Sequence, residues 1–269
     1  MDTIGFIGSG NMAEALIKGL IAAGVYRREQ IFVSDILPDR LEHFVHTYGV
    51  QLAQDNGALA ATVDTVVLSV KPQVLESVLG EIKTNVGLQT LIISIAAGKR
   101  IEVITKILGD VAVVRVMPNT PALVGKGASG VFANAKARGR LEEALRIFEA
   151  VGTAVVLDSE ELIDAVTAVS GSGPAYFFLL MEEMIKAGVE LGLEGELARE
   201  LVLQTAAGAA ALAIDASKKG EEPASLRRKV TSPGGTTQAA IETFEANGLP
   251  QAVRAGINKA YQRSKELSA

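Results

Sequence analysis

Hydrophobic and polar positions follow two different periods along the first part of the chain. Short runs rich in β-branched residues predict buried strands at residues 3–7, 30–34, 65–70, 90–95, 111–116 and 153–157. Between them, apolar positions at three- and four-residue spacing predict helices at residues 12–23, 40–48, 74–83, 101–108 and 141–151. Regular alternation of strand and helix is typical of βαβ units. We therefore expect an α/β fold with a Rossmann-type, doubly wound parallel sheet over residues 1–157.

The strand pattern ends near Asp158, where we place a domain boundary. Helical periodicity then predicts an all-α domain over residues 158–269, with helices at 175–191, 196–217, 224–230, 236–247 and 250–267. The run Thr205–Ile214 is rich in small residues, and the helices are apolar around much of their circumference. Such helices often complete their core against a second subunit, so we expect a homodimer. The alternative is that these residues pack only within one chain.

Composition and charge narrow the class of protein. With 269 residues, of which 48% are hydrophobic, the chain is large enough for two globular domains. The net charge is −5 and the basic residues are scattered, which disfavours a nucleic-acid partner. The chain has no cysteine, which excludes disulfides, thiolate catalysis and thiolate metal sites. The only two histidines, His43 and His46, lie three residues apart on a predicted helix and are expected to face solvent, so no metal site is predicted.

The pattern also bears on localisation. No uninterrupted apolar run approaches the ~18 residues that a membrane span requires. A predicted strand follows Met1 almost directly, without a basic region and an apolar stretch before it. We therefore expect a soluble, cytoplasmic protein with no membrane partner.

The first predicted strand is followed at once by a glycine-rich turn, Gly8-Ser9-Gly10-Asn11-Met12-Ala13, which opens the first helix. In a dinucleotide-binding turn the first glycine allows the tight bend and the second lets the pyrophosphate approach the backbone. A small third residue, here Ala13, permits close packing of helix on sheet. A turn of this kind is specific only in this strand–turn–helix context, which is present here.

Ser34 and Asp35 stand at the end of the second predicted strand. An acid at this position normally accepts hydrogen bonds from the adenosine ribose and disfavours a 2′-phosphate, which favours NADH over NADPH. Two alternatives stay open. Arg40 and Ser34 together are able to hold a phosphate, and Asp35 could simply cap the helix that begins near Pro38.

Two further loops follow predicted strands, at Lys71-Pro72 and at Ala96-Ala97-Gly98. Carboxyl ends of parallel strands are where an open α/β sheet binds its ligand. Lys71 is therefore a candidate for the ribose or pyrophosphate, and the alternative is a solvated loop lysine.

A second glycine-containing loop, Ser232-Pro233-Gly234-Gly235-Thr236-Thr237, separates two predicted helices in the C-terminal part. The two glycines let the backbone bend close to a bound group, and Pro233 is tolerated in the first turn of a helix. Exposed amides and hydroxyls at a helix N-terminus suit a small anion, because the helix dipole is positive there. The sequence therefore predicts a site for a carboxylate.

Six motifs in order make the chain resemble the Δ1-pyrroline-5-carboxylate reductase family along its whole length. They lie at residues 4–12, 70–73, 94–98, 115–122, 170–176 and 230–237, with the sequences IGFIGSGNM, VKPQ, SIAAG, RVMPNTPA, SGSGPAY and VTSPGGTT. The resemblance implies an enzyme of the last step of proline biosynthesis, in which NAD(P)H reduces a cyclic imine to L-proline. It also implies a helical domain that interleaves with that of a second subunit, and dimers that often assemble into decamers.

The resemblance assigns expected roles to individual residues. The turn from Gly8 to Met12 is expected to hold the pyrophosphate, and the segments at Ala97 and Asn119 to line the cofactor cleft. The adenosine half is expected to be flanked by Asn56, Val70, Lys71 and Pro72. The substrate loop is expected to consist of Ser232, Gly234, Gly235, Thr236 and Thr237, with Thr237 facing the ring nitrogen.

The chemistry that this implies is mainly orientation, because an imine is basic enough to be protonated without a dedicated strong acid. Thr237 is then the candidate catalytic residue, able to hydrogen-bond the nitrogen and relay a proton, or alternatively to cap its helix. A β-hydroxyacid dehydrogenase is the competing enzyme class, but it needs a lysine base one turn into the helix after Gly173, and no lysine occurs before Lys186. A non-catalytic dinucleotide-sensing protein is the third alternative.

Overall fold

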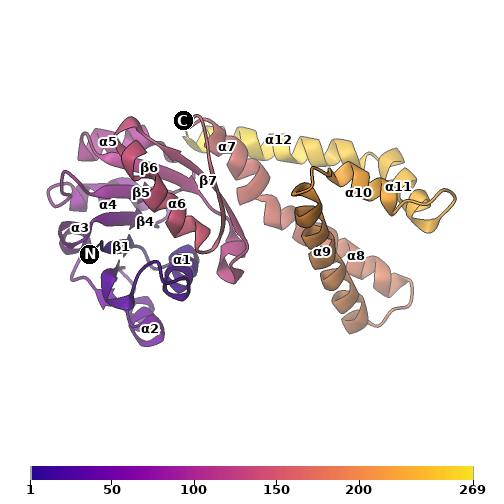
Figure 1. Cartoon of the computed structure of the whole chain (residues 1–269), viewed down its shortest axis with the longest axis horizontal. Coiled ribbons are helices and arrows are strands. Elements are labelled where there is room, and N and C mark those ends of the chain that lie inside the picture. The colour runs from indigo at the N-terminus through magenta and orange to yellow at the C-terminus, as the bar shows by residue number, and fades with distance from the viewer. Residues whose placement is uncertain (1, 269) are drawn as a thin grey trace. The chain divides into compact units, whose positions relative to one another are not determined.

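The computed structural model describes residues 2–268 and contains one eight-stranded sheet (Figure 1). The strand order is β3-β2-β1-β4-β5-β6-β7-β8, and every neighbouring pair is parallel except β6 and β7. The strands are β1 (Ile4–Ile7), β2 (Ile31–Ser34), β3 (Gln51–Leu52), β4 (Thr65–Leu68), β5 (Leu91–Ser94), β6 (Ala112–Met117), β7 (Gly127–Ala133) and β8 (Gly152–Val156). The order reverses at β1, which lies between β2 and β4, and such a reversal is where doubly wound sheets bind ligands.

Each helix expected from apolar periodicity is present, with ends that shift by one or two residues. The expected helices of the sheet region are α1 (Asn11–Ala22), α2 (Pro38–Tyr48), α4 (Leu75–Ile82), α5 (Ile101–Leu108) and α6 (Leu141–Glu149). Two further helices, α3 (Asn56–Thr62) and α7 (Leu162–Val166), were not predicted. The expected helices that follow are α8 (Gly173–Glu190), α9 (Gly195–Ser217), α10 (Pro223–Lys229), α11 (Thr236–Ala246) and α12 (Leu249–Ser268). Short 3-10 turns and one π-helical turn, Thr167–Gly171, connect several of them.

Four elements were not part of the expected pattern: β3, α3, β7 and α7. Strand β7 reads GASGVFA, and its glycines hide the alternation of apolar and polar side chains that identifies a strand. A side chain does not fit at Gly130, because a Cβ there would lie 2.8 Å from Val166 Cγ2. The connection from β6 to β7 holds only a 3-10 turn at Thr120–Val124, which is too short for a parallel crossover, so β7 runs antiparallel.

The strands are buried on both faces, and adjacent residues of one strand point into different cores. In β4, Val67 belongs to a cluster formed with α1, α2 and α6. Its neighbour Val66 belongs to a second cluster formed with α3, α4 and α5. Continuous apolar strands are what a sheet covered on both faces requires. The carboxyl ends of the strands are therefore held in a fixed scaffold.

The chain divides into two compact units that differ from the division expected at residue 157. Unit 1 comprises residues 1–174 and 259–269, and unit 2 comprises residues 175–258. Beyond β8 the chain stays with the sheet, because Val166 of α7 packs against Gly130 of β7. The last turns of α12 return to unit 1, where buried Asp164 accepts hydrogen bonds from Ser264 (2.7 Å) and Ser268 (3.0 Å).

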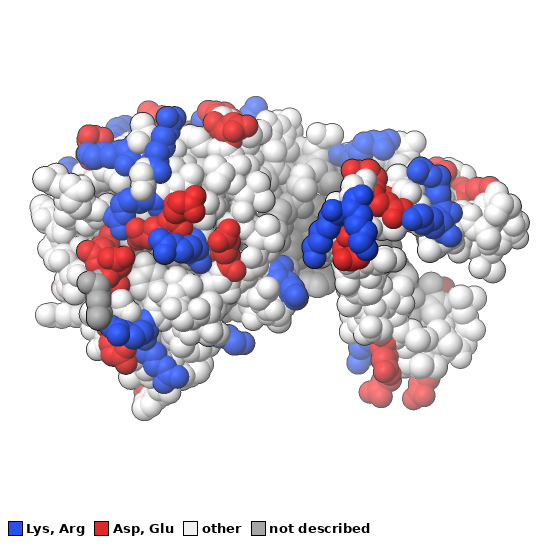
Figure 2. Space-filling model, in the orientation of Figure 1, with Lys and Arg blue, Asp and Glu red and all other residues white. Residues whose placement is uncertain are grey.

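Unit 2 buries very few side chains in a single chain. Among its residues only Ala198, Val202 and Ala216 are buried. Helices α8 and α9 meet where Gly188 faces Ala198, at a distance of 3.3 Å from a Cβ built on the glycine. Apolar side chains remain exposed on both helices, among them Phe177, Phe178, Leu179, Leu201, Leu212 and Ile214. The surface of these two helices in Figure 2 is largely free of charge, whereas both signs of charge are interspersed over unit 1.

Two helical stretches of the described residues are long and apolar enough to cross a membrane, judged by length and composition alone. They span Leu162–Glu190 and Gly195–Ser217, with mean hydropathy of 1.2 and 1.3. The first arises because α7, the π-helical turn and α8 follow one another as a single helical stretch. Uninterrupted apolar runs did not predict it, since charged residues such as Glu182 and Lys186 interrupt the sequence.

Candidate functional site

The glycine turn lies at the point where the strand order of the sheet reverses. Gly8 has a φ of +96°, and its amide donates to the Ser34 carbonyl of β2 at 2.8 Å. A Cβ at this position would lie 2.7 Å from the Ser69 carbonyl oxygen, so only glycine fits between β1 and the segment after β4. The Ser69 hydroxyl in turn donates to the Gly8 carbonyl at 2.6 Å. Sequence reasoning missed Ser69, which becomes recognisable only once β1 and β4 are known to be neighbours.

Gly10 is the N-cap of α1, and no side chain caps that helix. A Cβ built on Gly10 would meet no atom within 4 Å, so open space lies beside it. An uncapped helix N-terminus beside open space fits a pyrophosphate, because the helix dipole and backbone amides attract a negative group. The residues present are therefore suited to the dinucleotide that the sequence predicts.

Asp35 is bound to the glycine turn. Its Oδ2 accepts from the Ser9 amide at 2.6 Å and from the Ser9 hydroxyl at 2.7 Å, and its Oδ1 accepts from the Leu37 amide at 3.0 Å. Partial burial would raise the pKa of Asp35, but these hydrogen bonds hold it below its usual value. Leu37, not Asp35, occupies the N-cap position of α2, and it makes no side-chain cap bond. The carboxylate therefore joins the end of β2 to the turn.

Arg40 approaches the same turn from α2. Its Nε and Nη2 donate to the Ser9 carbonyl at 2.9 and 2.6 Å, and Nη2 also donates to Glu14 Oε2 at 2.9 Å. The other Glu14 oxygen contacts His43 Nε2 at 2.8 Å and accepts from the Tyr48 hydroxyl at 3.0 Å. The expectation of a solvent-facing histidine pair is wrong for His43, because tertiary contact with α1 draws it to Glu14.

The remaining histidine and the Ser34 hydroxyl have different partners. His46 is exposed and lies 3.5 Å from Glu42 on its own helix. Ser34 is buried, and its hydroxyl donates to Asn56 Oδ1 at 2.8 Å, while Asn56 Nδ2 donates to Glu81 at 2.6 Å. A surface pocket of about 530 Å³ adjoins this chain of contacts and is lined by Asp55, Asn56, Gly57, Ala58, Glu81 and Asn85. The structure thus brings together two of the residues that were expected beside the adenosine, Ser34 and Asn56.

The other residues expected around the cofactor belong to the carboxyl-end loops. Lys71 is exposed, and its ammonium makes no hydrogen bond or ion pair within residues 2–268, while its carbonyl accepts from the Val74 amide at 3.1 Å. Val70 and Pro72, on either side of it, are half-buried. Ala97 is exposed beside Gly98, which has a φ of +68° and packs on Leu267 of α12.

Asn119 is buried, and its side chain makes hydrogen bonds to two other segments of unit 1. Its Oδ1 accepts from the Ala128 amide at 2.9 Å, and its Nδ2 donates to the Ser170 carbonyl at 3.1 Å. Its side chain therefore ties β7 to the π-helical turn.

A buried ion pair that the sequence did not reveal supports the loop after β5. Arg115 of β6 is 2% exposed and donates to Glu160 Oε1 at 2.9 Å. The same oxygen accepts from the Ile101 amide at 2.8 Å, at the first residue of α5. Glu160, which lies 59 residues after Ile101, therefore links β6 to the start of α5. No local pattern marks such a residue, because its partners become neighbours only in the folded chain.

The predicted substrate loop lies in unit 2 and leads into α11. Gly234 has a φ of +72°, which favours glycine, and the Gly235 amide donates to the Ser232 carbonyl at 3.0 Å. A Cβ at Gly235 would lie 2.5 Å from the Ser232 hydroxyl oxygen. Gly235 is the N-cap of α11, so this helix begins at Thr236, after Pro233.

Two side chains near the start of α11 differ in their hydrogen bonding: Gln238 has a partner, and the Thr237 hydroxyl has none among the described residues. Gln238, which sequence reasoning missed, accepts from the Gly234 amide at 2.6 Å through its Oε1. The Thr237 side chain is half-buried, and its hydroxyl makes no hydrogen bond within residues 2–268. No side chain caps α11, so Thr237 does not fill the capping role that was its alternative.

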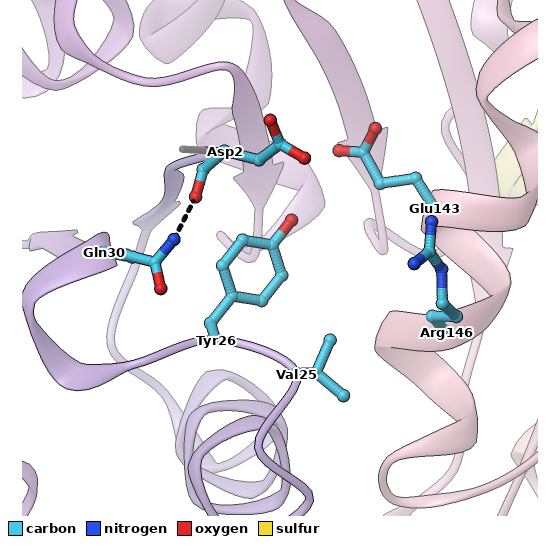
Figure 3. Close-up of a pocket in the computed structure, with 6 residues that line it drawn as sticks. All are labelled: Asp2, Val25, Tyr26, Gln30, Glu143 and Arg146. Atoms are coloured by element: carbon cyan, nitrogen blue, oxygen red, sulfur yellow. Dashed lines mark hydrogen bonds between the residues drawn. The ribbon is translucent and has the colours of Figure 1, made fainter.

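A second surface pocket lies away from these residues, at the amino ends of the strands (Figure 3). It has a volume of about 260 Å³ and is lined by Asp2, Val25, Tyr26, Gln30, Glu143 and Arg146. Gln30 donates to the Asp2 carbonyl at 2.8 Å, as the dashed line in Figure 3 marks. Asp2 precedes β1 and Gln30 precedes β2, so this pocket is on the opposite edge from the glycine turn.

Comparison with known proteins places these features in a family context. Residues 160–267 match the family described as pyrroline-5-carboxylate reductase dimerisation. Residues 3–98 match the family described as NADP oxidoreductase, coenzyme F420-dependent. The pyrroline-5-carboxylate reductase of Pseudomonas aeruginosa is 49% identical over 267 residues, which cover 98% of this chain and 96% of that protein.

Solved structures show the same relationship. A pyrroline-5-carboxylate reductase from Coxiella burnetii aligns with a TM-score of 0.92 at 41% identity, covering 100% of this chain and 99% of that one. Pyrroline carboxylate reductase from Plasmodium falciparum, solved with NADP bound, aligns with a TM-score of 0.88 at 31% identity, covering 100% and 98%. The similarity therefore includes both compact units.

Proposed function

The chain belongs to the pyrroline-5-carboxylate reductase family, and from this premise we propose that it reduces the C=N bond of L-1-pyrroline-5-carboxylate to L-proline with NAD(P)H. This is the last step of proline biosynthesis. The observation that carries the proposal is the relationship over the full length, which includes both the glycine turn at Gly8 and the loop at Ser232–Thr237.

The cofactor is assigned to the carboxyl ends of β1, β2, β4 and β5. The amides at the start of α1, beside Gly10, would hold its pyrophosphate, because they are uncapped and face open space. Ser34, Asp35 and Asn56 would bound its adenosine half. The exposed Lys71 and the flanking Val70 and Pro72 would lie along the same side, and the segments at Ala97 and Asn119 would border the nicotinamide half. When bound, NAD(P)H supplies the hydride.

The substrate carboxylate is assigned to the loop that precedes α11. Backbone amides at Gly235 and Thr236, and the hydroxyls of Ser232 and Thr236, provide donors at a positive helix end. Thr237 would hydrogen-bond the ring nitrogen, since its hydroxyl has no other partner within residues 2–268. These residues would hold the ring in one orientation for hydride transfer, and orientation supplies most of the rate enhancement.

The chain lacks a suitable lysine base for the competing β-hydroxyacid dehydrogenase reaction. Lys186 is the first lysine in α8, and its ammonium contacts Glu182 at 2.7 Å and Glu183 at 2.8 Å. Hydrogen bonds to these two carboxylates raise the pKa of Lys186 above its usual value. A group held protonated in this way does not accept a proton from a hydroxyl, which argues against alcohol oxidation.

We also propose that the chain forms a homodimer through unit 2, and that dimers assemble further, up to a decamer. The nearly coreless unit 2 and the exposed apolar residues of α8 and α9 support this, because such faces are stable in water only when covered. The matched dimerisation region, residues 160–267, covers the same helices. A protein partner, rather than a membrane, would then cover these helices in a cytoplasmic enzyme.

One experiment tests the proposed activity directly. Oxidation of NADH and of NADPH by the purified protein is followed separately at increasing pyrroline-5-carboxylate, with proline identified as the product. We expect turnover with at least one of the two cofactors. Absence of oxidation with both would overturn the proposal. A 3-hydroxyisobutyrate-type substrate with NAD⁺ is the comparison reaction, and no turnover is expected there.

A further inference from the structure

The positively charged guanidinium of Arg40 lies close to the end of β2 and points toward the glycine turn. Two of its nitrogens donate to the Ser9 carbonyl at 2.9 and 2.6 Å, and Nη2 also contacts Glu14 at 2.9 Å. The guanidinium also lies over the Phe44 ring, 5.3 Å from its centre. Nη1 makes no hydrogen bond within residues 2–268, so a rotated Arg40 would have a donor to offer elsewhere.

Glu14 determines where this guanidinium points. It stands in the first turn of α1, and its side chain is 22% exposed. His43 and Tyr48, both from α2, contact its second oxygen at 2.8 and 3.0 Å and hold the carboxylate toward α2. His43 and Tyr48 hold Glu14, while the Ser9 carbonyl and the Phe44 ring hold Arg40, which distinguishes this ion pair from an ordinary mobile surface pair.

Ser9 is held by opposite charges on its two sides. Asp35 accepts from the Ser9 amide and hydroxyl, while Arg40 donates to the Ser9 carbonyl. The described region at the end of β2 therefore contains two carboxylates, Asp35 and Glu14, and one guanidinium, that of Arg40, which is already bonded to Ser9 and Glu14. A 2′-phosphate carries between one and two negative charges, and this charge balance disfavours its entry.

We propose that Glu14 is a specificity-determining residue, which favours NADH over NADPH by holding Arg40 on the Ser9 carbonyl and neutralising it there. The inference rests on the proposed function, because it requires a nicotinamide dinucleotide at the glycine turn. Glu14 does not contact the adenosine ribose in this account. It acts through Arg40, which without its partner carboxylate becomes a cation able to bind the 2′-phosphate.

The test measures binding of NAD⁺ and of NADP⁺ by calorimetry at one ionic strength, without substrate or turnover. The variants are Glu14→Gln, Arg40→Met and the double variant. We expect Glu14→Gln to shift the affinity ratio toward NADP⁺ by about tenfold, because it removes a nearby charge and frees Arg40. The double variant should not show this shift of the affinity ratio toward NADP⁺. Arg40→Met alone changes the ratio by less than about threefold, since Arg40 in the unmodified protein is not offered to the phosphate.

The matched control is Glu143→Gln. Glu143 pairs with Arg140 at 2.7 Å and is 18% exposed, so the change removes a comparable ion pair. Glu143 accepts a hydrogen bond from the Thr65 hydroxyl, at the amino end of β4 and away from the glycine turn. Glu143→Gln should leave the affinity ratio unchanged, with melting temperatures recorded for all variants.

Two results would overturn the proposal. One is an unchanged affinity ratio in folded Glu14→Gln. The other is a native preference for NADP⁺ that Arg40→Met abolishes, which would make Arg40 itself a phosphate ligand; this result is informative even if Glu14→Gln does not fold. Failure of the unmodified protein to bind either nucleotide would contradict the proposed function instead, and so is distinguishable from both.

Discussion

Asp35 accepts two short hydrogen bonds from Ser9, one from the backbone amide at 2.6 Å and one from the hydroxyl at 2.7 Å. The two residues are 26 positions apart in sequence, yet one oxygen of the carboxylate accepts both bonds. The amide and hydroxyl of Ser9 are therefore already used inside the protein. A bound pyrophosphate must then rely on the amides that follow, at the start of α1.

Asp35→Asn should destabilise the protein and weaken dinucleotide binding together. The neutral side chain loses charge-assisted bonds to Ser9, which are worth about 1–3 kcal/mol in comparable sites. Urea unfolding and the KM for NADH would measure the two effects. Asp39→Asn, an exposed change in the first turn of α2, is the control. Equal stability of the two variants would show that the Ser9 contact contributes nothing.

Acid should remove a stabilising contribution from two carboxylates near the turn. Burial raises the pKa of Glu14, but hydrogen bonds from His43, Arg40 and Tyr48 more than offset this and lower it below 4.5; that of Asp35 is likewise lowered below 3.8. A lowered folded pKa means that the stabilisation is complete above the unfolded pKa and is lost as pH falls through the folded value.

Unfolding free energies measured between about pH 7 and about pH 3 should therefore fall with acid. The fall should be shallower in a Glu14→Gln, Asp35→Asn double variant, because neither group then titrates. An equally steep fall in both proteins would assign the acid sensitivity to other groups.

Two glycine substitutions should separate folding from cofactor binding. Gly8→Ala places a Cβ 2.7 Å from the Ser69 carbonyl oxygen at a φ of +96°, so we expect loss of at least about 1–2 kcal/mol of stability. Gly10→Ala meets no protein atom within 4 Å and should leave the melting temperature unchanged. Its methyl group would instead occupy the space assigned to the pyrophosphate, so the KM for the dinucleotide should rise. An unchanged KM for Gly10→Ala would remove that assignment.

Thr237→Ala should lower kcat without lowering stability. The hydroxyl has no partner within residues 2–268, so its removal leaves no unsatisfied group behind. Thr243→Ala is the matched control on the same helix, because its hydroxyl donates only to the Ala239 carbonyl at 2.8 Å. Steady-state kinetics and thermal melts on both variants would test this. Unchanged turnover in Thr237→Ala would discard its role at the ring nitrogen.

Ile214→Lys should weaken assembly of the subunits. Ile214 is 63% exposed in the single chain, within the small-residue helix α9, and a charge there opposes burial against a partner. Sedimentation velocity at several concentrations would measure the shift toward monomer. Leu88→Lys, at an 83% exposed position of unit 1, should leave the sedimentation coefficient unchanged.

Elements with a strong period were predictable, and those that depend on distant partners were not. Apolar periodicity identified α1 to within a few residues because the helix buries one regular face, and a continuous run of β-branched residues identified β4, which is buried throughout. It did not identify β7, whose position is set by β6 and β8 on either side and whose glycines carry no side-chain signal. Edge strand β3 has only two residues, too few for any pattern.

In the candidate site, too, local features were predictable and contacts between distant residues were not. The glycine turn was predictable, because Gly8 and Gly10 serve a backbone geometry that is local in sequence. The contact between Asp35 and Ser9 was not, since the end of β2 and the glycine turn become neighbours only after folding. Glu160 gave no signal for the same reason, although it joins β6 to α5.

Because the last turns of α12 pack on unit 1, unit 1 completes its contacts only late in synthesis. The turns that carry Ser264 and Leu267 pack on Asp164 and Gly98, but they are translated after all of unit 2. Domains generally fold as units while the chain emerges from the ribosome. Here the nucleotide unit acquires its last contacts only when the helical unit has already been made, so a chain interrupted within unit 2 would leave the loop at Gly98 without its support.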